Sequence, residues 1–145
     1  MNDNNHDAGY FIAFIKKELD KTKNNDIKEY NITHIQFQVI MFLHHNEDKM
    51  IFQKDIEAEL NVSKATASGI IDRLEMNGFI KRTPLETDSR YKYLTLCPKA
   101  FEFTDDILSK CRKNEERLFN GFEEKERKEA IGYLERMLNN LKENK

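Results

Sequence analysis

The chain has 145 residues, of which 39% are hydrophobic and 34% charged, with only five glycines and two prolines. This composition is typical of one helix-rich globular protein and excludes collagen-like, disulfide-stapled and proline-rich disordered classes. No apolar stretch approaches the roughly 18 residues that a membrane span requires. The first residues are polar where a secretion signal would be basic and then apolar. We therefore expect a cytoplasmic protein without a membrane partner.

The formal net charge of −2 excludes a strongly basic nucleic-acid-binding domain. The charge is nevertheless uneven, because residues 63–93 carry six basic side chains against four acidic ones. This mild positive excess in one contiguous third of the chain indicates where a nucleic acid would bind.

Helical periodicity predicts a first helix from about residue 8 to residue 23, which the polar segment 24–26 ends. A second helix opens at Thr33, where Gln36 completes a Thr-x-x-Gln capping box, and stops near residue 45. Its dense apolar positions predict a mostly buried helix.

The next segments are short. Residues 50–52 read as a brief strand and residues 53–60 as a short helix. Ser63 is a good N-cap for a further helix over residues 64–77, because its hydroxyl can accept from a free backbone N–H. Gly78 stands where a left-handed residue would end that helix.

Two aromatic and β-branched runs, residues 79–83 and 91–96, predict a pair of strands joined by the polar loop 84–90. Pro98 then suits the first position of a long helix, since its missing N–H needs no partner there. A last helix is predicted over residues 123–142.

Two short helices joined by a sharp turn and followed by a β-hairpin make a winged helix-turn-helix. We therefore predict a mainly α fold with a small β-wing (α+β). Its expected parts are an N-terminal arm and dimerisation helix (1–32), the winged helix-turn-helix (33–97) and C-terminal dimerisation helices (98–145).

Four motifs resemble the MarR family of bacterial transcription regulators, and the resemblance extends over nearly the whole chain. They are the segments 62–75 (Val-Ser-Lys-Ala-Thr-Ala-Ser-Gly-Ile-Ile-Asp-Arg-Leu-Glu), 78–82 (Gly-Phe-Ile-Lys-Arg), 88–90 (Asp-Ser-Arg) and 94–96 (Leu-Thr-Leu). The resemblance implies a homodimer that binds a pseudo-palindromic DNA duplex.

In that docking mode the helix 64–77 lies in the major groove with its N-terminal residues toward the base edges. Arg90 at the wing tip enters the adjacent minor groove, held by a charge-assisted bond from Asp88. The expected DNA-binding residues are Ser63, Lys64, Ala65, Thr66, Ser68, Gly69, Arg73, Arg82, Asp88 and Arg90. Two alternatives stay open: Asp88 and Arg90 as an ordinary surface pair, and Arg73 paired internally with Asp72 or Glu75.

The terminal helices carry more apolar residues than one small core needs, although packing within the chain would also use such stripes. A symmetric dimer would supply the second DNA half-site. The expected dimerisation residues are Phe11, Phe14, Ile15, Ile131, Leu134, Leu138 and Leu141. The resemblance also implies a small aromatic or anionic effector, which no residue pattern identifies.

No metal signature and no cofactor motif stand out, because His34, His44 and His45 lack ligand spacing. Cys111 falls on an apolar helical face and is expected to be an inert core thiol, although a redox role for Cys97 or Cys111 is left open. No nucleophile, base or glycine-rich loop stands at a recognisable spacing, so we expect no enzyme.

These observations predict a sequence-specific DNA-binding transcription regulator, an autoregulating repressor relieved by a small ligand. The alternative is a winged-helix dimer with little sequence readout, which acts as a protein-interaction module or as a redox or metal sensor.

Overall fold

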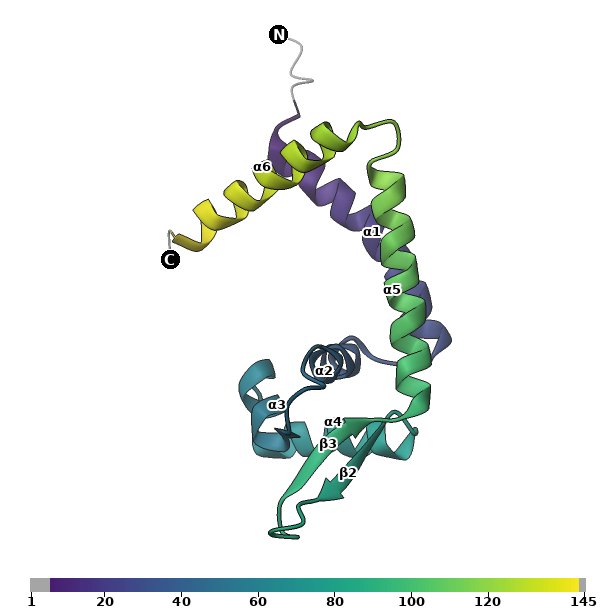
Figure 1. The fold of residues 1–145 in the computed structure, drawn as a ribbon, viewed down its shortest axis with the longest axis vertical. Helices are drawn as coiled ribbons and strands as arrows, with labels where there is room; N and C mark the ends of the chain where they lie inside the picture. The colour runs from purple at the N-terminus through teal and green to yellow at the C-terminus, as the bar shows by residue number, and fades with distance from the viewer. Residues whose placement is uncertain (1–5, 144–145) are drawn as a thin grey trace. The chain divides into compact units, whose positions relative to one another are not determined.

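The computed structural model describes residues 6–143, so residues 1–5 of the expected N-terminal arm and residues 144–145 lie outside the described part (Figure 1). The described chain divides into two compact units, one up to Lys110 and the other from Cys111 onward. The elements are α1 (Ala8–Glu29), α2 (His34–His45), β1 (Ile51–Phe52), α3 (Gln53–Leu60), α4 (Lys64–Met76), β2 (Ile80–Pro84), β3 (Lys92–Leu96), α5 (Pro98–Leu118) and α6 (Glu124–Glu143).

The helix-turn-helix forms from local signals that the sequence displays. Thr33 caps α2 in a full capping box, since its hydroxyl accepts from the Gln36 N–H at 3.2 Å and its own N–H donates to the Gln36 side chain at 3.1 Å. Asn61 takes the left-handed conformation (φ 53°) between α3 and α4, which gives the sharp turn that joins them. Gly78 takes the same region at φ 80° and ends α4, as predicted.

The sheet has three antiparallel strands in the order β1-β3-β2. β2 and β3 form the predicted hairpin, with Ile80 opposite Leu96 and Pro84 opposite Lys92. β1 adds only two pairings, Ile51 with Leu94 and Phe52 with Tyr93. Because Phe52 directly precedes α3, this pairing ties the start of the helix-turn-helix to the wing sheet.

The core of the first unit gathers residues from helices and strands around Phe103 of α5. Its ring is fully buried and makes edge contacts with Tyr30, Phe37 and Phe79, at centroid distances of 4.9, 6.0 and 6.2 Å. The first part of α5 thereby holds the end of α1, α2 and the start of the hairpin against one apolar centre.

The predicted end of the first helix is wrong, because α1 continues through residues 24–26 to Glu29. The polar segment favours a stop on local grounds, yet Ile27 in the last turn is buried. Tyr30, just beyond it, packs on Phe103. Tertiary packing therefore extends the helix to Glu29, and Asn31, at a positive φ of 55°, turns the chain just beyond it.

The second unit contains the end of α5, a turn and α6. Gly121 makes the turn at a φ of 82°. The Arg127 guanidinium lies 5.5 Å from the centroid of the Phe119 ring and 3.4 Å from a Glu115 carboxylate oxygen. Throughout residues 6–143, no helix combines the length and the apolar character needed to cross a membrane.

Candidate nucleic-acid interface

The N-terminus of α4 exposes backbone donors at the protein surface. Ser63 caps it, since the Ser63 hydroxyl accepts from the Thr66 N–H at 3.1 Å and donates to the Thr66 hydroxyl oxygen at 2.9 Å. The remaining N–H groups of the first turn, beside the exposed Lys64, suit an anion such as a phosphate. Thr66 can still donate its own hydroxyl hydrogen to a base or a phosphate.

One face of α4 is buried and the opposite face is open. Ala67, Ile70, Ile71 and Leu74 face the core. Of the expected DNA-binding residues on this helix, Ser68 is half-buried and the others are exposed: Lys64, Ala65, Thr66, Gly69 and Arg73. Nothing lies within 4 Å of a Cβ placed on Gly69, so the backbone there is open to a close approach.

The wing loop holds its arginine in one place. Asp88 accepts three bonds from Arg90: from Nε at 3.0 Å, from Nη2 at 2.8 Å and from the backbone N–H at 3.1 Å. The Arg90 side chain is 84% exposed and that of Asp88 30%. The pairing lowers the pKa of the Asp88 carboxyl and raises that of the Arg90 guanidinium. The expected bond from Arg90 to Asp88 is confirmed, and the guanidinium presents its charge to solvent.

Arg82 has partners that the sequence did not indicate. Its Nη2 donates to Asp72 Oδ1 at 2.7 Å and its Nη1 to Glu75 Oε1 at 3.0 Å, and its backbone N–H donates to Glu75 Oε2 at 3.1 Å. These are the two carboxylates that we had considered for Arg73, which is instead exposed on the outer face of α4.

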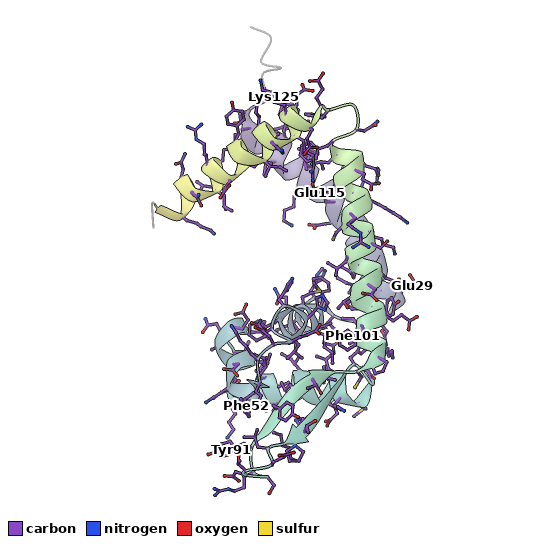
Figure 2. The ribbon with its side chains drawn as sticks, in the orientation of Figure 1. Glu29, Phe52, Tyr91, Phe101, Glu115 and Lys125 are labelled. Atoms are coloured by element: carbon purple, nitrogen blue, oxygen red, sulfur yellow. The ribbon has the colours of Figure 1, made fainter. Side chains whose placement is uncertain are left out.

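A groove of about 780 Å³ runs between the N-terminal ends of α3 and α4 and the wing. Five of its lining residues are basic and two acidic, so the groove is positive. Figure 2 shows Phe52 and Tyr91 along the same side of the hairpin. The lining comprises Phe52, Gln53, Lys54, Glu57, Lys64, Glu75, Arg82, Leu85, Arg90, Tyr91, Lys92 and Leu94.

The groove brings together three of the predicted site residues, Lys64, Arg82 and Arg90. It also adds residues that sequence reasoning missed, above all Lys54 and Lys92. Lys92 was detectable, because it begins a strand directly after the wing and is exposed. Lys54 was not, since the pairing of β1 with β3 places the start of α3 beside the wing.

The three histidines considered as metal ligands and the two cysteines do not line this groove. No group of three or more His, Cys, Asp or Glu side chains in the described part of the chain is placed to hold a metal ion. The expectation for Cys111 is wrong, because this thiol is exposed rather than part of a core, whereas Cys97 is half-buried. The single chain leaves the α5 face at Cys111 uncovered.

The fold and the positive groove define a winged helix-turn-helix protein of the DNA-binding class. A model described as the MarR family matches residues 30–90. The uncharacterized HTH-type transcriptional regulator YwoH of Bacillus subtilis strain 168 is 32% identical over 117 residues, which cover 81% of this chain and 82% of YwoH. The transcriptional repressor MprA of Escherichia coli K12 is 28% identical over 94 residues, 65% of this chain and 53% of MprA.

Solved structures share the fold over nearly the whole chain. The Staphylococcus aureus MepR–DNA complex superposes with a TM-score of 0.79 at 22% identity, covering 92% of this chain and 98% of MepR. MepR bound to ethidium bromide gives a TM-score of 0.77, also at 22% identity, over 95% and 99% of the two chains. The chain belongs to the MarR family, and it is a DNA-binding transcription regulator.

Proposed function

We propose that this protein is a homodimeric repressor that binds a pseudo-palindromic operator with α4 in the major groove and Arg90 in the minor groove. The observation that carries the proposal is the wing pair, in which Asp88 holds an arginine that is 84% exposed. A guanidinium fixed in this way enters a narrow, negative minor groove with little loss of side-chain freedom.

The contacts of α4 complete the proposed docking. Lys64 and the capped N-terminus at Ser63 take a phosphate, while the first turns of the helix face base edges. Arg73 reaches a further phosphate from the exposed face. Short hydroxyl side chains read several bases poorly, so the backbone and the shape of the duplex carry much of the recognition. The proposed contacts on α4 are Ser63, Lys64, Ala65, Thr66, Ser68, Gly69 and Arg73.

A dimer supplies the second half-site, and exposed apolar side chains on α1 and α6 support it. In the single chain the seven expected dimerisation residues are between 42% and 75% exposed, so packing within one chain leaves a large part of each side chain uncovered. On α6 four of them follow the spacing of a coiled-coil seam, at intervals of three, four and three residues. They are Ile131, Leu134, Leu138 and Leu141. We accordingly assign residues 1–32 and 98–145 to dimerisation and residues 33–97 to DNA binding.

Regulation by a small aromatic or anionic molecule is part of the same proposal. MepR, which shares this fold, has been solved with ethidium bromide. A ligand that binds one arrangement of the dimer better than another shifts the DNA-competent population. We further propose that the protein acts in the cytoplasm, represses its own or a neighbouring operon by excluding polymerase, and has no enzymatic activity.

Fluorescence anisotropy tests the proposal with duplex DNA from upstream of the gene beside a scrambled duplex, at two salt concentrations. We expect the native duplex to bind more tightly, with an affinity that falls as salt rises. Arg90→Ala should weaken binding by about 1–3 kcal/mol. Equal, weak binding to both duplexes that ignores the mutation would instead favour a protein-interaction module.

A further inference from the structure

Three side chains link the recognition helix to the wing strand. Asp72 and Glu75 stand three residues apart on α4, and Arg82 stands on β2. The Arg82 guanidinium bonds one oxygen of each carboxylate, at 2.7 and 3.0 Å, and the second Glu75 oxygen accepts the Arg82 backbone N–H. Glu75 therefore holds both the side chain and the backbone of the strand. We refer to Asp72, Glu75 and Arg82 as the clamp.

The clamp directs Arg82 toward the protein. Its side chain is 21% exposed, against 57% for Asp72 and 41% for Glu75. A guanidinium is planar and carries several N–H donors in fixed directions, so two carboxylates on one helix fix its orientation. The ammonium group of a lysine would not be oriented in this way. Exposed ion pairs contribute little to stability. The main effect of the clamp is therefore to fix the orientation of Arg82 relative to α4.

The clamp lies between the two elements, α4 and β2, that lead to the proposed DNA contacts. Beyond Arg82, β2 continues to Pro84, and the chain then enters the loop that carries Arg90. The other end of α4 carries Ser63 and Lys64. The angle between α4 and β2 thus sets the separation of the two proposed DNA contacts, the helix N-terminus and the wing tip.

We propose that Arg82 is a positioning residue for DNA binding, and that the clamp fixes the angle at which α4 and the wing meet one duplex. The inference rests on the proposed function and deepens it. It replaces the expected direct DNA contact of Arg82 with a role that acts through Asp72 and Glu75. It also explains why Asp72 and Glu75 lie close to the DNA-binding surface, although their negative charges alone would oppose DNA binding.

The direction in which Asp72→Asn changes the DNA affinity distinguishes a positioning role of the clamp from a simple effect of charge. Removing a negative charge near DNA should tighten binding if charge alone decides. In our proposal Asp72→Asn loses a charge-assisted bond of the clamp, and binding of the native duplex becomes about five- to tenfold weaker. Glu86→Gln is the matched control, because it removes one exposed wing-loop carboxylate outside the clamp. That variant should bind equally or more tightly, and Asp72→Asn binding as tightly as this control would overturn the proposal.

The salt dependence separates positioning from direct phosphate contact. Each phosphate contact that is lost lowers the slope of log K against log salt by about 0.9. We expect Lys64→Gln to lower the slope by that amount, and Arg82→Gln to weaken binding while the slope stays unchanged. Arg82→Lys keeps the positive charge but lacks the planar guanidinium, so its affinity for the native duplex should be little higher than that of Arg82→Gln. Full recovery with lysine, or a reduced slope for Arg82→Gln, would overturn the clamp.

A measurement on the free protein distinguishes failure of the clamp from failure of the proposed function. Amide hydrogen exchange at Arg82 should accelerate in Glu75→Ala, while circular dichroism reports an intact helix content. Unchanged exchange would overturn the clamp even if wild-type protein binds its duplex tightly. Wild-type protein that ignores the native duplex would overturn the proposed function and the role of the clamp in it.

Discussion

The Lys99 ammonium lies 3.0 Å from the backbone carbonyl oxygen of Asn77 and 4.5 Å from the centroid of the Phe79 ring. Asn77 is the C-cap of α4 and Lys99 stands in the first turn of α5, so one cation joins the end of the recognition helix to the next long helix. A positive charge at a helix C-terminus is favourable, and the aromatic face adds a cation–π contact.

Lys99→Met keeps the apolar stem and removes the charge. We expect the free energy of unfolding to fall by about 0.5–1 kcal/mol, with a smaller difference at high salt because screening weakens the lost interaction. Urea denaturation at two salt concentrations measures both the loss of stability and its salt dependence. Lys81→Met, at an exposed position on β2, should leave the stability nearly unchanged.

Phe103 is the side chain whose loss should damage the first unit most. Its fully buried ring contacts Tyr30, Phe37 and Phe79, so truncation leaves a cavity between these three rings. We expect Phe103→Ala to lower the free energy of unfolding by about 3–5 kcal/mol in thermal or urea denaturation. Phe101→Ala on the same helix, where the ring is partly exposed, should cost about 1 kcal/mol or less. Equal losses would contradict this account of the core.

The phenol of Tyr30 donates to Asp106, and this bond is the largest of the effects that raise the pKa of Tyr30 from 10.0 to about 12. Because the pKa of Tyr30 is higher in the folded state than in the unfolded state, the Tyr30–Asp106 bond contributes fully to the free energy of unfolding below pH 10. This contribution is lost as the pH rises toward 12. The stability difference between wild type and Tyr30→Phe should therefore shrink over this range. Tyr133→Phe, at an exposed tyrosine, serves as the control for loss of a phenol hydroxyl.

The wing pair should respond to acid in the opposite sense. Arg90 lowers the pKa of Asp88 below 3.8, so the pairing is complete above that pH and is lost as the pH falls through the lowered value. Carboxyl carbon chemical shifts in an NMR titration would show Asp88 titrating below 3.8. In Arg90→Ala the midpoint should move back toward 3.8, and an unchanged midpoint would mean that Arg90 is not the cause.

The proposed dimer depends on the apolar seam of α6. Leu138→Glu places a charge within it, and we expect sedimentation velocity to show a shift from dimer to monomer together with weaker operator binding. Asn139→Glu adds the same charge at an exposed polar position outside the seam and should leave the dimer intact. A wild-type protein that sediments as a monomer would refute the assignment.

Elements specified by neighbouring residues were predictable from the sequence. The Thr33 capping box, the Ser63 cap and the left-handed Gly78 each place an element boundary within a few residues, and α3 has the predicted bounds. The end of α1 was not predictable in this way, because burial of Ile27 against distant residues overrides a polar segment.

The site shows the same division. Asp88 and Arg90 are two residues apart, so their bond follows from the sequence of one loop. The bond between Asp72 and Arg82 spans ten residues and a turn, and the sequence offers Arg73 as an equally reasonable partner. Only the placement of β2 beside α4 decides between the two arginines.

The strand order β1-β3-β2 leaves β2 at the rim of the sheet. A strand in that position offers unpaired backbone groups to any neighbouring chain and can seed aggregation. Here the strand is only five residues long, carries an exposed Lys81 and ends at Pro84, which has no N–H to donate. The wing is thereby protected against edge-to-edge association, so crowded copies remain free to find DNA.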